Sequence, residues 1–251
     1  MKTIISVSML LAVVTMLAIS IPAGAVNTDS RIESSAKKSY VFRTYLQADD
    51  IKIQSTDGAV TLTGTVIDES HKSLAKETVA SLPGVKSVDN LLEVKGEIPS
   101  KSSDAWLTTK VKMTLLFHRS VSAGRTEVDV HNGVVTLRGD TASEAKKELT
   151  TEYAKDVEGV KDVINEMIVK KNSKKTRTEG RKIDDASITA LVKMTLLYHR
   201  STSAIDTKVE TNRGVVKLSG KAKDASEINL ATKYANDVNG VRSVNNQMTI
   251  E

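Results

Sequence analysis

The feature of the sequence that most constrains its fold is a unit repeated along the chain. The ten residues VKMTLLFHRS at 111–120 return as VKMTLLYHRS at 192–201, an offset of 81 positions. The heptapeptide GVVTLRG recurs as GVVKLSG at the same offset, and a more divergent copy, GAVTLTG, lies 75 positions before it. Repetition at a fixed spacing indicates that one supersecondary unit is used several times. The three units are expected at residues 30–95, 105–170 and 186–251, with polar linkers at 96–104 and 171–185.

Each unit shows the pattern of two helices and three strands. In the second unit, Leu107, Val111 and Leu115 recur at helical spacing and predict the buried stripe of a first helix. Two alternating strands follow, joined at Asn132-Gly133, where glycine permits the positive φ of a tight hairpin. A second helix is expected over 144–157, and a last strand closes the unit. The predicted fold class is therefore α/β, of the α+β type: three tandem α-β-β-α-β domains, each a three-stranded sheet covered by two helices.

The N-terminus has the pattern of a secretory signal peptide. Lys2 precedes an apolar run that ends near Ile21, and Ala23-Gly24-Ala25 is an A-x-A cleavage pattern, so residues 1–25 are expected to be removed. An uncleaved membrane anchor is the alternative, because the run is almost long enough to span a bilayer. The chain contains no cysteine, which excludes both a lipid-modified cysteine and disulfides. The mature protein is expected to be periplasmic.

Three elements of each unit together resemble the BON domain: the first helix, the hairpin V-x-(T/N)-x-x-G-V-V-x-L-x-G, and G-V-x-x-V-x-N after the second helix. The third unit is the most similar, with DDASITALVKMTLL, VETNRGVVKLSG and DVNGVRSVNNQMTI. The resemblance covers the whole expected mature chain in three copies. It implies a non-enzymatic envelope protein similar to osmotically inducible periplasmic proteins, associated with phospholipid binding, outer-membrane integrity, osmotic or envelope stress, and in some members chaperoning.

His118 and His199 occupy the same position in the second and third units, a repetition that could indicate a metal or catalytic site. Arg43 stands at this position in the first unit. No HExxH or G-x-S-x-G motif is present, and no carboxylate or second histidine recurs at ligand spacing. The favoured interpretation is structural: each His-Arg pair lies in the last turn of its helix, near unpaired carbonyl groups. No catalytic residue, metal or cofactor is predicted.

The first helices of the second and third units carry a second apolar face beside the core stripe. Its residues are Trp106, Met113, Leu116, Phe117, Met194, Leu197 and Tyr198. Packing between the two units, or a wider core, would explain this face. The alternative is an exposed patch that enters a bilayer interface or binds an unfolded client.

The second linker concentrates positive charge. Seven Lys and Arg residues lie between positions 170 and 182 beside one acidic residue, Glu179, which gives a local net charge of +6. The predicted lipid-binding cations are Lys171, Lys174, Lys175, Arg177, Arg181 and Lys182. A solvated, flexible spacer is the alternative. Nucleic acid is not expected as a partner, because no aromatic residue interrupts the run.

These patterns predict a string of three units that maintains the envelope under stress by peripheral binding of anionic phospholipid. The second helix face would supply apolar insertion, and the linker would supply electrostatic attraction. Two alternatives remain: a periplasmic holdase chaperone for unfolded exported proteins, and a structural adaptor that binds other envelope proteins. Lipid attraction through the linker is expected to weaken in high salt, whereas apolar client binding is expected to persist.

Overall fold

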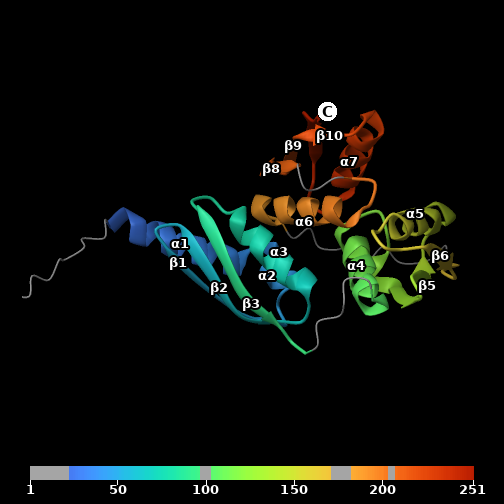
Figure 1. Cartoon of the computed structure of the whole chain (residues 1–251), viewed down its shortest axis with the longest axis horizontal. Helices are drawn as coiled ribbons and strands as arrows, with labels where there is room; N and C mark the ends of the chain where they lie inside the picture. Colours follow the sequence, from blue (N-terminus) through green and yellow to red (C-terminus); the bar gives the residue numbers. More distant parts are fainter. Residues whose placement is uncertain (1–22, 97–102, 171–181, 203–206) are drawn as a thin grey trace, which may run out of the picture.

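The structure is a computed structural model that describes residues 23–96, 103–170, 182–202 and 207–251. It contains three units with the same order of helices and strands (Figure 1). In each unit two strands form an antiparallel hairpin, and the strand after the second helix pairs in parallel with the second hairpin strand. The predicted α/β class is confirmed.

The first unit differs from the others in its first helix. Its elements are α1 (Ala23–Lys38), α2 (Tyr40–Thr44), β1 (Asp50–Thr56), β2 (Ala59–Val66), α3 (Glu69–Ala80) and β3 (Ser87–Val94). Ser39 separates α1 from α2, and its hydroxyl accepts the N–H of Phe42 at the start of the second segment. The first helix is therefore divided in this unit, whereas it is continuous in the other two.

The second and third units have the same order of elements, except that β5 of the second unit corresponds to two strands, β9 and β10, in the third. The second unit comprises α4 (Asp104–Phe117), the short 3-10 turn η1 (Ala123–Arg125), β4 (Thr126–His131), β5 (Val134–Thr141), α5 (Glu144–Lys155), β6 (Asp162–Asn165) and β7 (Ile168–Val169). The third comprises α6 (Asp185–Tyr198), β8 (Lys208–Asn212), β9 (Val215–Ser219), β10 (Lys221–Ala222), α7 (Ala225–Asp237), β11 (Ser243–Asn246) and β12 (Thr249–Ile250).

The predicted last strand is interrupted in these two units, directly after an asparagine. In the second unit the Asn165 side chain accepts the N–H of Met167 and donates to the carbonyl of Lys147 in α5. The side chain therefore ties the last strand to the second helix. The aligned Asn90 makes the corresponding contacts with Leu92 and Lys72, although β3 of the first unit is continuous. Asn246 makes the same contacts with Met248 and Ile228.

The predicted core stripe and hairpin turn are confirmed. Leu107, Val111 and Leu115 are buried under the sheet of the second unit. Asn132 and Gly133 both have positive φ, 53° and 82°, as the tight turn requires.

One carboxylate fixes each hairpin turn to the first helix of its unit. Asp104 accepts the backbone N–H groups of Asn132 and Gly133 at 2.7 and 2.8 Å, while Ser103 caps the helix by accepting the N–H of Trp106. The helix is therefore capped by one residue and attached to the turn by the next. The same turn contact is made by the aligned aspartates Asp29 and Asp185.

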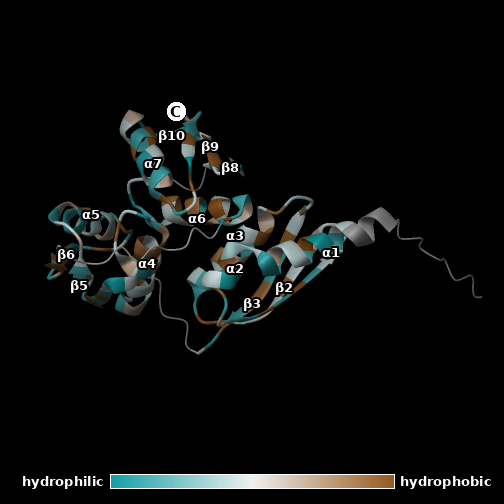
Figure 2. Ribbon diagram, turned by 180° about the vertical axis from the view of Figure 1, so that it is seen from behind, coloured by the Kyte–Doolittle hydropathy of each residue, from teal (hydrophilic) through white to brown (hydrophobic). Residues whose placement is uncertain are grey.

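The three units pack against one another, which corrects the expectation of separate units on a string. Helix α6 lies at the centre of the molecule, with α3 of the first unit on one side and α4 of the second on another (Figure 1). Eleven of its fourteen residues are buried, so α6 has apolar neighbours well beyond its own sheet. Figure 2 accordingly shows brown residues on α4 and α6 and mostly teal and white residues on α5. No helix in the described ranges is long and apolar enough to cross a membrane.

Candidate functional site

The two copies of the repeated decapeptide meet at the interface between the second and third units. His118 at the end of α4 and His199 at the end of α6 are both almost completely buried. Their Nε2 atoms lie 3.2 Å apart. Each ring stacks on a tyrosine of its own unit, Tyr153 for His118 and Tyr234 for His199, with 3.9 Å between ring centroids. These two residues are called the histidine pair, and the units that carry them the paired units.

Each histidine and its stacked tyrosine face an aspartate of the opposite unit. Asp156, at the end of α5, accepts the Tyr234 hydroxyl at 2.8 Å and His199 Nδ1 at 3.1 Å. Asp237, at the end of α7, accepts the Tyr153 hydroxyl at 2.9 Å. His118 Nδ1 lies 3.2 Å from Asp237 Oδ2, within ion-pair distance but outside hydrogen-bond geometry. The Ser120 hydroxyl also donates to Asp237, and the Ser201 hydroxyl donates to Asp156, again across the interface.

The arginine that follows each histidine caps a helix of the opposite unit. The Arg119 guanidinium donates to the carbonyls of Asn236 and Val241, at the C-terminal end of α7. Arg200 donates in the same way to Lys155 and Val160, at the end of α5. The expectation that cations meet a helix C-terminus is correct, but the predicted helix is wrong, because the capped helix lies in the other unit.

Each of these contacts therefore occurs twice, with the roles of the two units exchanged. The exchange extends to the backbone, where the N–H of Arg119 donates to the Asp237 carbonyl and that of Arg200 to the Asp156 carbonyl. One surface binds a copy of itself, which is the arrangement of a two-fold symmetric dimer interface. Here both copies belong to one chain.

Burial and hydrogen bonding set the charge of the interface. Burial acts to raise the pKa of Asp156 and of Asp237, but their polar partners outweigh it and lower both. These partners are hydrogen bonds from His199, Ser201 and Tyr234 for Asp156, and the nearby His118 ring with hydrogen bonds from Ser120 and Tyr153 for Asp237. Burial and the neighbouring carboxylates raise the pKa of both Tyr153 and Tyr234, which stay protonated. The interface therefore contains two charged carboxylates and two neutral phenols. Burial lowers the pKa of His199, and the Asp156 hydrogen bond offsets this only in part.

The first unit binds the paired units by different contacts. Because the first helix is divided at Ser39, the N–H groups of Tyr40 and Val41 are free to donate to Asp184 and Ser187 at the start of α6, at 2.7 and 3.1 Å. The Tyr45 ring packs edge-on against Phe117 of α4, with centroids 5.6 Å apart. Lys193 of α6 forms an ion pair with Glu77 of α3 at 2.9 Å.

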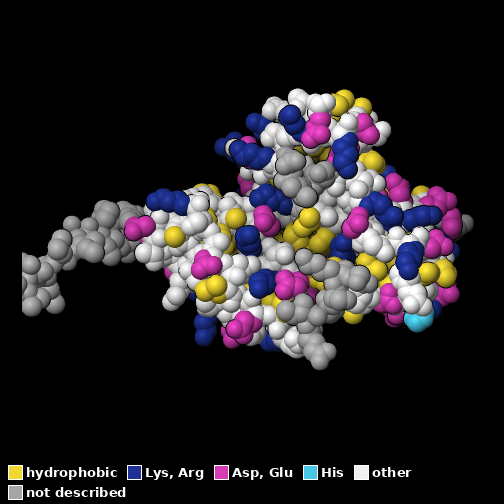
Figure 3. Space-filling model, in the orientation of Figure 1, with side chains coloured by type: hydrophobic (Ala, Val, Ile, Leu, Met, Phe, Trp, Pro, Cys, Tyr) yellow, Lys and Arg dark blue, Asp and Glu magenta, His cyan; other side chains and the backbone are white. Residues whose placement is uncertain are grey.

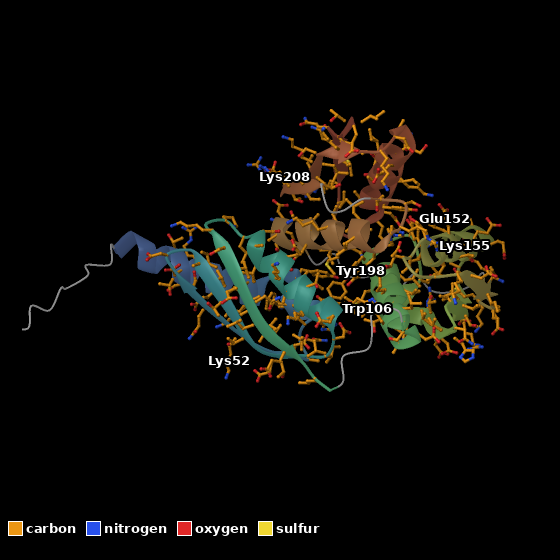
Figure 4. All side chains as sticks on the ribbon, viewed as in Figure 1. Lys52, Trp106, Glu152, Lys155, Tyr198 and Lys208 are labelled. Atoms are coloured by element: carbon orange, nitrogen blue, oxygen red, sulfur yellow. The ribbon has the colours of Figure 1, made fainter. Side chains whose placement is uncertain are left out.

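The second helix face divides into buried and exposed residues. Met113, Phe117, Met194 and Tyr198 have at most 5% of their surface exposed, so they form no surface patch. Contacts with another unit cover at least Phe117, against Tyr45, and Tyr198, under Lys110. Figure 4 shows Tyr198 near the place where the three units meet, below α6. The residues of this face that reach the surface are Trp106, which is half-buried, Leu116, 38% exposed, and Leu197, 50% exposed.

Leu197 borders two grooves that also contain cationic side chains. One groove, of about 580 Å³, lies between α3 and α6 and is lined by Lys72, Lys76 and Lys193, with Glu69 and Glu77. The other, of about 440 Å³, lies between α6 and α7 and contains Arg200 and Lys223 beside three carboxylates, Glu158, Asp224 and Glu227. Figure 3 shows hydrophobic side chains in the middle of this face of the molecule, with basic and acidic groups around them.

The cations predicted to bind lipid lie mostly outside the described residues. Lys171, Lys174, Lys175, Arg177 and Arg181 belong to this group, and Lys182 is exposed immediately before α6. Lys110, which flanks the second helix face, is buried instead: its Nζ donates to the Glu158 carbonyl at 3.0 Å and lies over the Tyr198 ring.

The sequence analysis did not identify the tyrosines and aspartates that contact the histidines. Tyr153, Asp156, Tyr234 and Asp237 lie at the ends of the second helices, whose only apolar residues besides the tyrosines are alanines and a few leucine or isoleucine residues. The available signal was YAKDV in the second unit, which returns as YANDV in the third at the offset of the histidines. Within the described ranges no group of three or more His, Asp and Glu side chains is arranged to bind a metal ion.

Comparison with known proteins gives a consistent set of relatives. The BON domain model matches residues 28–96, 103–171 and 184–251. Osmotically-inducible protein Y of Escherichia coli (strain K12) is 31% identical over 198 residues, which are 79% of this chain and 96% of that protein. The 21 kDa hemolysin of Actinobacillus pleuropneumoniae is 33% identical over 45% of this chain and 59% of its own length.

One further relative matches less than half of the chain, and one solved structure is only weakly similar. The outer membrane lipoprotein DolP of Haemophilus influenzae is 33% identical over 44% of this chain and 58% of its own length. This chain thus spans under two thirds of the hemolysin and of DolP. A structure of CdsD, a structural protein of the type III secretion system of Chlamydia trachomatis, aligns over 88% of this chain and 90% of its own at 17% identity, with a TM-score of 0.24. A score this low carries no argument.

Proposed function

Since the chain belongs to the BON-domain family, whose model matches it three times, we propose that it is a non-enzymatic protein of the cell envelope that acts under osmotic or envelope stress. The relative that matches most of the chain is named for osmotic induction, and another is named an outer membrane lipoprotein. The signal peptide predicted for residues 1–25 supports a periplasmic location. The chemistry of the described residues supports binding rather than turnover, because the buried histidines are occupied in pairing the units.

The mode of action that we propose is reversible binding to the surface of an anionic phospholipid membrane. The observation that carries it is Leu197, an apolar side chain half exposed beside the groove between α3 and α6, where three lysines outnumber two glutamates. Leu116, the aligned residue of the second unit, is also exposed, and the exposed Lys112 lies one turn before it. An apolar side chain that enters the headgroup boundary beside cations is typical of peripheral membrane proteins.

Electrostatic attraction would add to this apolar contact. Lys72, Lys76 and Lys193 line the groove on one side of Leu197, and Lys182 lies just before the same helix. Each cation near an anionic surface contributes about 1 kcal/mol, and salt screens the contribution. Lys193 already pairs with Glu77, so Lys72, Lys76 and Lys182 are the cations that matter most.

Sedimentation with phosphatidylglycerol vesicles tests this proposal. Leu197→Ser is expected to weaken binding roughly tenfold, because the variant loses the burial of one leucine side chain. Ile168→Ser is the matched control, since Ile168 is 61% exposed but lies on β7, away from the grooves. Phe117 is unsuitable for this test, because its substitution would disturb the interior.

Other outcomes separate this proposal from the two alternatives. Equal binding to phosphatidylcholine and phosphatidylglycerol, or unchanged binding of the folded Leu197→Ser variant, would contradict it. Suppression of client aggregation that persists in high salt would favour a holdase chaperone. A stoichiometric envelope partner that binds without lipid would favour a structural adaptor.

A further inference from the structure

The histidine pair places two titratable rings in direct contact at an interface between units. Their Nε2 atoms, 3.2 Å apart, can form a hydrogen bond only if one of them carries a proton and the other does not. His199 Nδ1 donates to Asp156, so in its neutral form His199 presents an unprotonated Nε2. His118 must then supply the proton between the two rings.

This assignment leaves one nitrogen of the pair without a hydrogen-bond partner. His118 Nδ1 is buried and unpartnered, yet it faces Asp237 Oδ2 at 3.2 Å. One added proton on this nitrogen would create an ion pair with the carboxylate. A second added proton must go to His199 Nε2, where it would point at the N–H of His118 across 3.2 Å. The pair therefore accommodates one extra proton and not two.

The charged groups around the pair come from both second helices. Asp156 and Glu152 approach from α5 and Asp237 from α7, and Arg119 and Arg200 lie 3.7 and 4.0 Å from Asp237 and Asp156. Each arginine thus balances one aspartate, and Glu152 pairs with Lys233 across the interface. Neutral Tyr153 and Tyr234 complete the surroundings. Asp156 and Asp237 are the carboxylates that lie against the two rings, and Glu158, Asp224 and Glu227 line the groove that His199 also borders.

We propose that the histidine pair is an acid-sensitive contact between the paired units: uptake of a second proton at His199 Nε2 separates them and uncovers the buried aromatic residues of their interface. Tyr153 and Tyr234, whose rings lie 5.7 Å apart across the interface, are the largest of these residues. The separated form would present to the envelope an apolar surface that the paired form hides.

The direction of the pH dependence follows from the environment of His199. Burial lowers its pKa below the ordinary 6.5, the Asp156 hydrogen bond acts in the opposite sense, and the His118 charge lowers it further. Because the pKa is lower in the paired form than in the separated form, the separated form binds more protons as the pH falls. The contribution of His199 to pairing is therefore complete above about pH 6.5 and is lost as the pH falls through its value in the paired form.

Distance measurements on the full-length protein test the proposal. The chain has no cysteine, so Glu148→Cys in α5 and Asn229→Cys in α7, both exposed and aligned with each other, would carry the only two spin labels. We expect one narrow distance distribution at about pH 7.5 and its loss in favour of longer distances at about pH 5. A distribution that does not change between these pH values would overturn the proposal.

The matched variants identify the histidines as the cause. His118→Gln with His199→Gln replaces the rings by neutral amides that can still bond to each other, so the narrow distribution is expected at both pH values. His131→Gln, at an exposed histidine of the same unit, is expected to behave like the unmodified chain. Equal separation at about pH 5 with and without the paired histidines would overturn the proposal.

A spectroscopic measurement on the unmodified histidines covers the case in which the double variant does not fold. Ring nitrogen NMR is expected to show His199 taking up its proton at the same pH at which the label distances lengthen. Separation that is complete before His199 is protonated, or protonation that leaves the units paired, would overturn the proposal.

Discussion

The paired units and the first unit have the same fold but different surfaces at the same positions. Five residues make the reciprocal contacts of the paired units, and all five differ in the first unit. Its residues at these positions are Arg43, Thr44, Tyr45, Thr78 and Ser81, in place of His118, Arg119, Ser120, Tyr153 and Asp156. The fold therefore forms without these five residues, which in the paired units make the contacts with the other copy.

The first unit lacks these five residues and contacts the third unit through its divided helix instead. The break at Ser39 frees two backbone N–H groups, and these donate to Asp184 and Ser187 of α6. These contacts are not reciprocal, because each joins different residues of the two units and has no symmetric counterpart among the described residues. Because the two interfaces use different chemistry, substitutions at aligned positions are expected to have different effects.

The largest difference is expected at an aligned pair of phenylalanines. Phe117→Ala removes a completely buried ring at the meeting point of three units and is expected to lower the free energy of unfolding by about 3–4 kcal/mol. Phe42→Ala, at the aligned and only half-buried position of the first unit, is expected to cost about 1–2 kcal/mol. Urea unfolding measures both values. Equal losses would show that the two positions are equivalent after all.

The next largest difference is expected at the carboxylates that face the histidines. Asp237→Asn weakens hydrogen bonds from Tyr153 and Ser120 and leaves the Arg119 charge unbalanced, so a loss of about 2 kcal/mol is expected. Ser81→Ala, at the aligned position of the first unit, removes one hydrogen bond to Glu77 and is expected to cost at most about 1 kcal/mol. Thermal or urea unfolding of the two variants side by side checks the order.

Acid is expected to affect the paired units through these carboxylates as well. Their pKa is lower in the folded protein than the ordinary 3.8, so they stabilise the fold above that pH. This stability is lost as the pH falls through the folded-state value, because the unfolded chain then binds more protons. The urea midpoint is therefore expected to fall less between about pH 5 and about pH 2.5 in Asp156→Asn with Asp237→Asn than in the unmodified chain. Parallel curves would contradict this role.

The smallest effect is expected where the first unit contacts α6 through an ion pair. Lys193 and Glu77 are each about one third exposed, so Lys193→Ala is expected to cost about 0.5 kcal/mol and less in high salt. Lys208→Ala, which removes a more exposed ion pair with Glu210 within the third unit, is the control. A loss larger than that of Asp237→Asn would reverse the comparison between the interfaces.

The sequence predicted the features that depend on local spacing. Leu107, Val111 and Leu115 follow the helical period, and Asn132-Gly133 has the backbone preference of one turn type, so neighbours along the chain determine both. The Phe117 ring packs against Tyr45 of another unit, and no local pattern specifies that contact. The two interpretations of the second helix face therefore stayed open until the units were placed.

The histidine partners were missed for a related physical reason. Asp156 and Tyr153 lie on a helix whose other side chains are mostly polar, a composition that is typical of a solvated face. Both residues recur at the offset of 81, as the histidines do. This recurrence indicates a shared interface only if each unit contacts the other through the same positions. The lysine-rich linker remains a prediction, since most of it lies outside the described residues.

The most direct test of reciprocal pairing is a double-mutant cycle across the interface. Tyr153→Phe and Asp237→Asn, measured singly and together by urea unfolding, are predicted to show a coupling energy of about 1 kcal/mol, because the tyrosine hydroxyl donates to that carboxylate. Tyr153→Phe with Asp162→Asn, at an exposed aspartate of β6 in the same unit, is predicted to be additive. Additivity of Tyr153 and Asp237 within about 0.3 kcal/mol would contradict the pairing of the second and third units.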